Sequence, residues 1–215
     1  MMERDDLLVT AARASIVAGR ATLDVYRSEI EVEYKEDRSP LTLADRRSHD
    51  IIVSRLNPTG IPILSEEGRD IPHAQRSRWH RLWIVDPLDG TKEFVKRLGE
   101  FTINIALVED RRPTLAAIFV PVKNVLYFGR VEDGSFRLDD SAAIAALASD
   151  AGQSAAPAVL QRLRAHAQKL PVDVDAHTPY IIVGSRSHAT PELHAYVDRK
   201  RSELGDVSFV SAGSS

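Results

Sequence analysis

The stretch "LWIVDPLDGTKEF", residues 82–94, decides how this chain folds, because an apolar run ends there in two aspartates, a proline and a glycine. A residue that precedes proline is pushed toward extended backbone, and Pro87 itself cannot donate a ladder hydrogen bond. We therefore predict a strand with Asp86 at its carboxyl end. Asp89 follows beside Gly90, whose backbone freedom lets the chain fold back and bring both carboxylates to one point.

Two carboxylates at one point require a cation. The motif offers oxygen donors and contains neither Cys nor His, which favours a hard ion such as Mg²⁺ over Zn²⁺. Thr91 can cap a short helix through Phe94, and the free amides at its start would form a phosphate cradle. The alternative is that Asp-Pro and Asp-Gly only turn the chain, as these residue pairs commonly do.

Two other segments favour the metal site over a simple turn. "IPILSEEG", residues 61–68, is again an apolar strand that ends in acids, here Glu66 and Glu67. "SPLTLAD", residues 39–45, ends in Asp45, which taken alone would be read as a helix cap. Together the three segments supply acidic groups at strand or helix ends, and we expect these groups to converge.

The first half of the chain reads as two helices followed by a sheet. Apolar residues recur at the helical repeat over residues 5–27, and Thr42 with Asp45 forms a capping-box-like start to a second helix that continues to the Asn-Pro-Thr-Gly break. Residues 30–35 alternate as a half-exposed strand. Short buried strands are predicted at 61–65 and 82–86, and the segments within 101–140 read as an antiparallel meander.

The second half reads as alternating strand and helix. Residues 141–158 are rich in Ala and Ser without a strong period, which indicates a linker or an exposed helical excursion. Beyond it we predict helices at 157–170 and 190–201 and strands at 180–184 and 206–213. We therefore expect an N-terminal α+β half at 1–140 that carries the acidic motifs, and a C-terminal α/β half at 141–215.

Composition excludes several classes of protein. The chain of 215 residues contains no cysteine, so a disulfide framework, a thiolate metal site and a Cys nucleophile are impossible. A net charge of −3 lacks the basic field of a nucleic-acid binder. The longest apolar stretches are too short for stable membrane insertion, and we expect a cytoplasmic protein, with a peripheral position at the inner membrane as an alternative. The sequence contains neither a P-loop nor a Gly-x-Ser-x-Gly elbow, and it does not reveal the oligomeric state.

The segments "DPLDGTKEF", "LSEEG", "SPLTLAD" and "VGSRSH" together resemble the inositol monophosphatase superfamily. Lys-Glu-Phe after the Asp-Pro-Leu-Asp-Gly-Thr signature, with "GEFTINIALV" beyond it, is similar to the CysQ-type 3'(2'),5'-bisphosphate nucleotidase branch. This resemblance implies a layered α-β-α-β-α sandwich of the sugar phosphatase type. It also implies Mg²⁺-dependent hydrolysis of the 3'-phosphate of adenosine 3',5'-bisphosphate by metal-activated water, with two or three Mg²⁺ ions and inhibition by lithium.

The resemblance also implies roles for individual residues. Metal ligands would be Glu66, Asp86, the carbonyl of Leu88 and Asp89, and the catalytic groups would be Asp45, Thr91 and Glu66. Glu67 would support the site without binding metal. Substrate-binding residues would be Glu66, Leu88, Asp89, Gly90, Thr91, Lys92, Ser185 and Arg186, the last two near the sugar or the second phosphate of a small phosphorylated nucleotide.

Members of the superfamily continue beyond the "GSS" at the end of this chain, into a Trp-Asp-Ala-Ala type motif whose aspartate completes the metal site. The chain ends at Ser215, so we expect a piece of an active enzyme that lacks the family's C-terminal part. Two alternatives stay open: an inositol or sugar monophosphatase of the same superfamily, or a non-catalytic module that binds Mg²⁺ and a phosphorylated ligand.

Overall fold

The computed structural model describes residues 2–28, 31–34, 40–149, 154–171, 180–186 and 190–213. The elements in chain order are α1 (Arg4–Tyr26), β1 (Val32–Tyr34), β2 (Pro40–Thr42), α2 (Leu43–Leu56), the 3₁₀ turn η1 (Asn57–Thr59), β3 (Ile63–Ser65), α3 (His73–Arg76), β4 (Arg81–Asp89), α4 (Thr91–Val95), β5 (Thr102–Glu109), β6 (Arg112–Val120), β7 (Val125–Arg130), β8 (Gly134–Leu138), α5 (Ser141–Ser149), α6 (Ala156–Ala165), β9 (Gln168–Leu170), β10 (Tyr180–Ser185), α7 (Pro191–Leu204) and β11 (Val207–Ala212).

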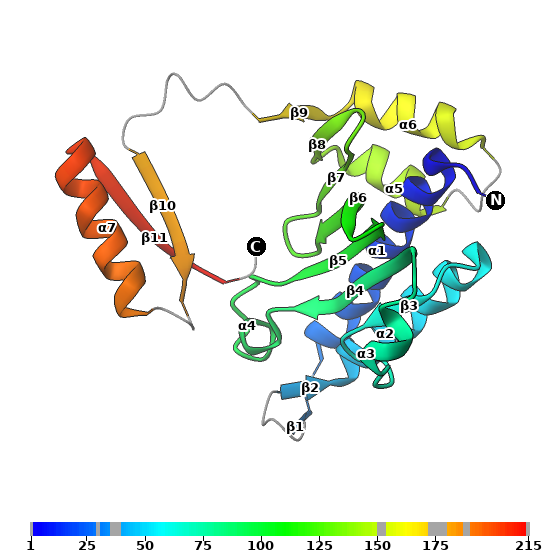
Figure 1. Cartoon of the computed structure of the whole chain (residues 1–215), viewed down its shortest axis with the longest axis horizontal. Helices are drawn as coiled ribbons and strands as arrows, with labels where there is room; N and C mark the ends of the chain where they lie inside the picture. The colour runs from blue at the N-terminus through cyan, green and yellow to red at the C-terminus, as the bar shows by residue number, and fades with distance from the viewer. Residues whose placement is uncertain are drawn as a thin grey trace.

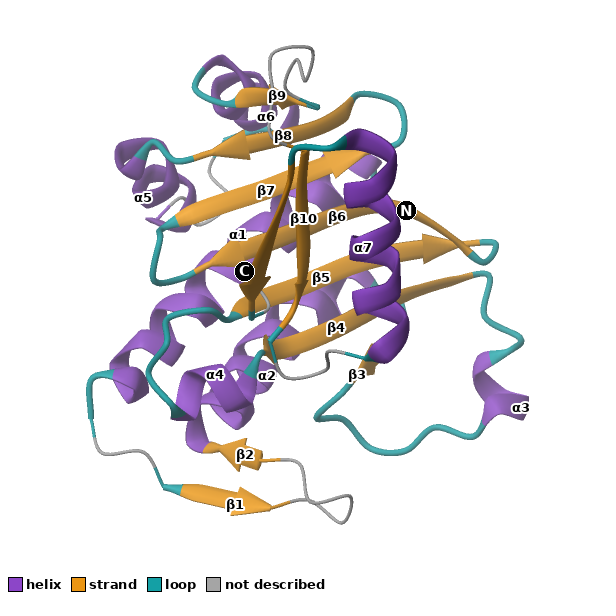
Figure 2. Ribbon diagram, turned by 90° about the vertical axis from the view of Figure 1, so that its left-hand side faces the viewer, coloured by secondary structure: helices purple, strands orange, loops and turns teal. Residues whose placement is uncertain are grey.

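A seven-stranded sheet in the order β3-β4-β5-β6-β7-β8-β9 forms the centre of the molecule (Figure 1, Figure 2). β3 pairs parallel with β4, and each later neighbour pairs antiparallel. The predicted meander is therefore confirmed, and so is a short strand before Glu66. The strand predicted at 82–86 exists, but β4 continues past Pro87 to Asp89, because a bulge lets its pairing with β5 resume at Asp89. The mixed α/β architecture expected from the sequence is confirmed as well.

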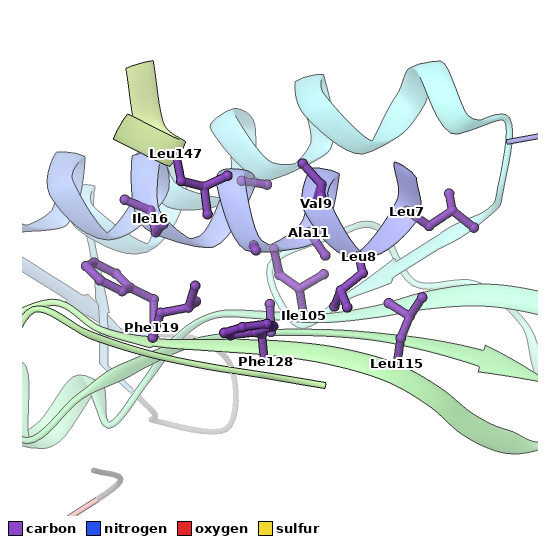
Figure 3. Close-up of a cluster of buried hydrophobic side chains, with 14 of the residues drawn as sticks. Leu7, Leu8, Val9, Ala11, Ile16, Ile105, Leu115, Phe119, Phe128 and Leu147 are labelled. Carbon is purple, nitrogen blue, oxygen red and sulfur yellow. The ribbon is translucent and has the colours of Figure 1, made fainter. Parts of the chain in front are cut away.

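Helix α1 covers one face of this sheet and forms the core with it (Figure 3). The long first helix predicted from periodicity is confirmed, and its apolar side buries Leu8, Ala11 and Ile16 against Ile105 and Phe119. In β4 the pleat sorts side chains by face, since Trp83 and Val85 are buried while Ile84 between them is exposed. The helical face of the sheet is thus the hydrophobic one, and α2 packs there beside α1.

The segment from 141 onward differs from the sequence-based prediction in two ways. Residues 141–149 form α5, which matches the helical alternative, but this helix buries Ile144 and Leu147 against the core and is therefore not a fully exposed excursion. The helix predicted at 157–170 ends at Ala165, and residues 168–170 become β9 because the edge of β8 offers them a hydrogen-bonding partner. The division of the chain at residues 140 and 141 stays a prediction, although α5, α6 and β9 adjoin the central sheet.

The C-terminal elements form a second, smaller layer (Figure 1). β10 and β11 pair in parallel, and α7 connects them. The predicted alternation of strand and helix is confirmed here. Parallel strands require such a crossover connection, which places α7 against this two-stranded sheet.

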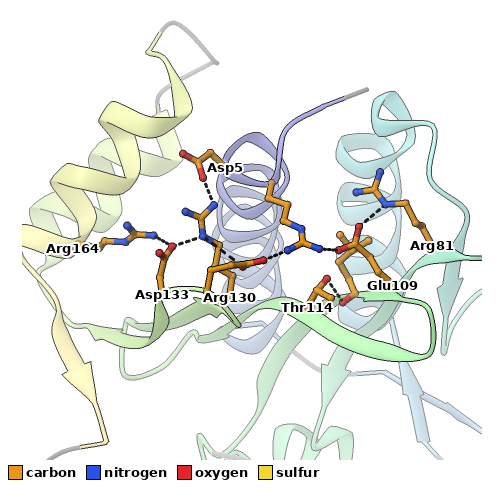
Figure 4. A network of polar contacts seen from close by, with 10 residues as sticks. Asp5, Arg81, Glu109, Thr114, Arg130, Asp133 and Arg164 are labelled. Atoms are coloured by element: carbon orange, nitrogen blue, oxygen red, sulfur yellow. Dashed lines mark hydrogen bonds and ion pairs between the residues drawn. The ribbon is translucent and has the colours of Figure 1, made fainter.

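A network of ion pairs ties the elements together at the start of β4 (Figure 4). Glu109 forms an ion pair with Arg81 at 2.9 Å and accepts a hydrogen bond from Arg4 at 2.7 Å. Arg130 pairs with Asp5 and Asp133, and Arg164 joins them through Asp133. Among the helices that the structure describes, none is long and apolar enough to cross a membrane.

Candidate active site

The carboxyl end of β4 carries two aspartates in an irregular stretch of the β4–β5 ladder. Asp86 pairs with Asn104 and Asp89 pairs with Thr102, so three steps along β4 correspond to two along β5. Residues three apart in a regular strand point to opposite faces. The extra residue of this bulge turns the chain, which allows both carboxylates to approach the same side.

Glu66 reaches the same place from the neighbouring strand. Because β3 runs parallel to β4 with Ser65 opposite Val85, the residue after β3 lies beside the end of β4, and the Glu66 amide donates to the Val85 carbonyl at 3.0 Å. Burial of Asp86 raises its pKa to about 8, and the negative charges of Glu66 and Asp89 and a hydrogen bond that protonated Asp86 donates to Glu66 add to the rise. These three acidic residues, which we call the acid cluster, thus repel one another.

Asp45 lies at the start of α2 and is almost completely buried. Its Oδ2 accepts from the Thr42 amide at 2.7 Å and from Thr42 Oγ1 at 2.6 Å, which forms a capping box. Its Oδ1 accepts from Thr91 Oγ1 at 3.2 Å. Burial raises the pKa of Asp45 above its ordinary value, although these hydrogen bonds oppose the rise. Asp45 is therefore a helix cap that also contacts the turn after β4.

That turn is shaped by Gly90, which has φ of 94° in the left-handed region that favours glycine. It is followed by α4, whose first residue Thr91 also lies 3.2 Å from the Leu88 carbonyl through its hydroxyl. The Leu88 amide donates to Asp86 Oδ1 at 3.2 Å. Lys92 is exposed on α4. The turn therefore holds the Thr91 hydroxyl, the Leu88 carbonyl and the start of a helix beside the acid cluster.

Other polar residues near the cluster were not singled out from the sequence. Asn104 Nδ2 donates to Asp89 Oδ2 at 3.4 Å, and Ser48 Oγ on α2 donates to the Pro87 carbonyl at 2.6 Å. Spacing could have revealed Ser48, because it lies three residues after Asp45 and so shares its helix face. Asn104 carried no such signal, since its role depends on the register between β4 and β5.

Ser185 and Arg186 lie at the end of β10 in the second layer. Arg186 donates to Glu100 through Nη1 at 2.7 Å and Nη2 at 2.8 Å, and Glu100 also accepts from the Gly213 amide at 2.6 Å. A Cβ at Gly213 would lie 2.7 Å from Glu93 Cγ, so the end of β11 touches α4. These contacts link the layer to the turn after β4 and engage Arg186 with Glu100. Ser187 and His188 lie outside the described residues.

The oxygen atoms of the acid cluster and the Leu88 carbonyl are of the type that binds a hard cation, although they do not form a complete coordination shell. No three Asp, Glu or His side chains of the described residues are arranged so as to hold a metal ion. Glu66 is exposed and Glu67 is half-buried in the turn after β3. The acid cluster and the Leu88 carbonyl offer oxygen atoms alone, and their mutual repulsion is relieved by positive charge, so the residues fit Mg²⁺. Their assignment as metal ligands stays a prediction.

The chain is similar in sequence to known proteins. A family model described as "Inositol monophosphatase family" matches residues 3–214. The 3'(2'),5'-bisphosphate nucleotidase CysQ of Shigella flexneri is 38% identical over 203 residues, which cover 92% of this chain and 69% of that protein. The protein of the same name from Escherichia coli K12 is 37% identical over the same length.

Solved structures give the same fold. The crystal structure of CysQ from Bacteroides thetaiotaomicron matches with a TM-score of 0.82 and 39% identity, over 98% of this chain and 73% of that one. The suhB protein from Bartonella henselae has a TM-score of 0.69 at 21% identity over 97% and 70% of the two chains, a likeness of fold alone. The layered α/β fold expected from the four sequence segments is therefore confirmed.

Proposed function

Because the chain belongs to the inositol monophosphatase family, we propose that it is a Mg²⁺-dependent phosphatase that converts adenosine 3',5'-bisphosphate to AMP and phosphate. The observation that carries this proposal is the meeting of an acid cluster with a hydrogen-bonded Asp45–Thr91 pair at the end of β4. The relatives of 37 to 38% identity bear the name of a 3'(2'),5'-bisphosphate nucleotidase, which supports the choice of substrate.

The proposed ligands of Mg²⁺ are Glu66, Asp86, Asp89 and the Leu88 carbonyl. Bound Mg²⁺ lowers the pKa of water and stabilises the charge that develops on a transferring phosphoryl group. In this proposal, the protein would supply four oxygen donors, which come from the end of β4 and the turn after β3. Asn104 restrains Asp89 through its amide, so the carboxylate does not have to be ordered entirely by the ligand.

Asp45 and Thr91 would accept the proton of the attacking water. With its own proton directed at Asp45 Oδ1, Thr91 Oγ1 has a lone pair left to accept a proton from water. As the water oxygen forms its bond to phosphorus, the bond from phosphorus to the 3'-oxygen would break and AMP would leave, its 3'-oxygen taking a proton from solvent. Thr91 would accept the proton of the attacking water and pass its own to Asp45. The raised pKa of Asp45 favours this step, since a carboxylate that is costly to keep ionised is a better base.

The remaining residues would hold the substrate. The first amides of a helix have no intrahelical partner, so those of Gly90 and Thr91 are suited to bind the scissile phosphate. Lys92 is exposed beside them and would attract the dianion. Ser185 and Arg186 are proposed for the sugar or the second phosphate, which Arg can bind in a bidentate manner if part of its guanidinium stays available beside Glu100.

Parallel assays on adenosine 3',5'-bisphosphate and inositol 1-phosphate, each with and without Mg²⁺, test the proposal. We expect Mg²⁺-dependent release of phosphate from the nucleotide at a higher kcat/KM than from the inositol ester. A preference for the inositol ester would identify an inositol or sugar monophosphatase instead. Binding of the nucleotide without release of phosphate would identify a non-catalytic module.

Lithium provides a second check, because the proposal includes inhibition by Li⁺. We also propose a cytoplasmic location. We do not propose a peripheral position at the membrane, because no feature of the described residues supports it. Phosphate release that is indifferent to both Mg²⁺ and Li⁺ would contradict the assignment of the acid cluster as a metal site.

A further inference from the structure

One face of α2 contacts the turn after β4, the end of β4 and the end of β3. Asp45, Ser48 and His49 are spaced i, i+3 and i+4, so their side chains emerge from the same side of the helix. Asp45 contacts Thr91, and Ser48 contacts the Pro87 carbonyl. His49 Nδ1 shares a hydrogen bond of 2.8 Å with Ser65 Oγ, and the tautomer of the ring decides which atom donates.

The contact of His49 matters because Ser65 immediately precedes Glu66. The Glu66 side chain is largely exposed to solvent and contacts the Asp86 carboxyl in the acid cluster. Because this side chain starts from the turn after β3, the backbone of that turn sets how it meets Asp86. Two backbone hydrogen bonds hold this turn on the side of the sheet. The Glu66 amide donates to the Val85 carbonyl, and the Gly68 amide donates to the Ser65 carbonyl at 3.0 Å. His49 supplies the contact from the helix side.

We propose that His49 is a positioning residue that acts through Ser65 to aim Glu66 at Asp86 and the metal. The inference rests on the proposed function, since it concerns the same Mg²⁺ site. A carboxylate ligand binds a cation well only when its orientation is set in advance, and loss of such an outer contact typically lowers metal affinity by about 10- to 100-fold. His49 does not touch the substrate in this account.

Titration of metal-free protein with Mg²⁺, followed by the rise in melting temperature, tests the inference without relying on turnover. The variants are Ser65→Ala, His49→Phe and the double variant, with His49→Asn as a conservative replacement whose amide can reach the position of Nδ1. Ser54→Ala is the matched control, because Ser54 lies on the same helix and its hydroxyl bonds only locally to the Ile51 carbonyl.

We expect Ser65→Ala and His49→Phe each to raise the Mg²⁺ midpoint by about tenfold, and the double variant to match the single ones, because all remove one contact. His49→Asn and Ser54→Ala should stay within about threefold of the wild type. If His49→Phe fails to fold, Ser65→Ala decides. An unchanged midpoint in folded Ser65→Ala would overturn the inference alone. A wild type whose melting temperature ignores Mg²⁺ would overturn this inference and the proposed metal site together.

Discussion

The two ends of β4 are both polar, and they differ in charge balance. At the first end, Arg81 faces Glu109 at 2.9 Å within a network in which arginines alternate with carboxylates. At the carboxyl end, Asp86 and Asp89 face Glu66, and Asp86 has its pKa raised to about 8 by burial and by the neighbouring acids. A single strand thus joins a neutralised end to an end with excess negative charge.

The pKa values of the acids show what this difference means. Burial raises the pKa of Asp133, but Arg130 and Arg164 outweigh it and hold that pKa below its ordinary value. For Asp86, the charged neighbours among the described residues that shift its pKa are the acids Glu66 and Asp89, and only the hydrogen bond from the Leu88 amide opposes the rise. Acids paired with arginine stabilise the fold, whereas acids gathered without it indicate a site for a cation.

The largest expected effect is the loss of catalysis when an acid is neutralised at the carboxyl end. Asp89→Asn should lower kcat/KM for adenosine 3',5'-bisphosphate by more than about a hundredfold, since even an outer contact of a metal ligand is worth about 10- to 100-fold. Asp133→Asn at the balanced end is the control and should keep its turnover. Comparable losses in the two variants would remove the functional distinction between the ends.

Asp86→Asn should stabilise the metal-free protein by about 1–3 kcal/mol at pH 8, because it removes a buried charge beside two others. The direction of this change in stability follows from the difference between the pKa of Asp86 in the folded and unfolded states. With a folded pKa of about 8 and an ordinary value of 3.8, Asp86 costs stability progressively as pH rises from about 4 through about 8. The advantage of the variant, measured by urea unfolding in EDTA, should therefore shrink toward pH 4. A variant less stable than the wild type at pH 8 would contradict the view that the acid cluster at the carboxyl end of β4 carries excess negative charge.

At the balanced end, Arg130→Met should lower the free energy of unfolding by about 1–2 kcal/mol while leaving kcat/KM unchanged. The substitution keeps much of the packing volume but leaves Asp5 and Asp133 without their shared partner. Urea unfolding and the phosphatase assay on the same sample measure both quantities. A selective loss of turnover would show that this network belongs to the site after all.

The smallest expected effect concerns Lys92, which is exposed beside the turn. Lys92→Gln should raise KM for the nucleotide by about two- to threefold at low salt, and the difference should fade near 0.5 M salt, because an exposed charge is screened. A difference that persists at high salt would indicate a direct, desolvated contact with phosphate.

The sequence predicted best those parts in which local chemistry and periodicity agree. The first helix, the presence of strands before the acidic motifs, the meander and the turn at Gly90 all follow from apolar spacing and from turn preferences. The end of β4 does not, because a bulge carries the strand past Pro87 to Asp89. The segment 141–149 was left open between a linker and a helix, because Ala fits both a buried and an exposed helix face and α5 gave no clear period. The helix predicted from residue 157 is present as α6. In contrast, β9 exists because β8 offers it an edge, which no local pattern records.

For the site, the sequence identified acidic residues at element ends but not the contacts that orient them. Asp45 looked like a cap and is one, and its second contact with Thr91 depends on how α2 packs against β4. Asn104 and the pairing of Arg186 with Glu100 likewise depend on register and on the approach of distant segments. The charged residues of the site can thus be predicted from the sequence. The residues that orient them can be identified only from the folded structure.

The most direct test of the central claim is diffraction from crystals of this protein soaked in Mn²⁺, which replaces Mg²⁺ at oxygen sites and scatters anomalously. We expect an anomalous peak at the carboxyl end of β4, within about 2.5 Å of oxygen atoms of Glu66, Asp86 and Asp89. A peak confined to other carboxylates, or no peak at saturating Mn²⁺, would contradict it.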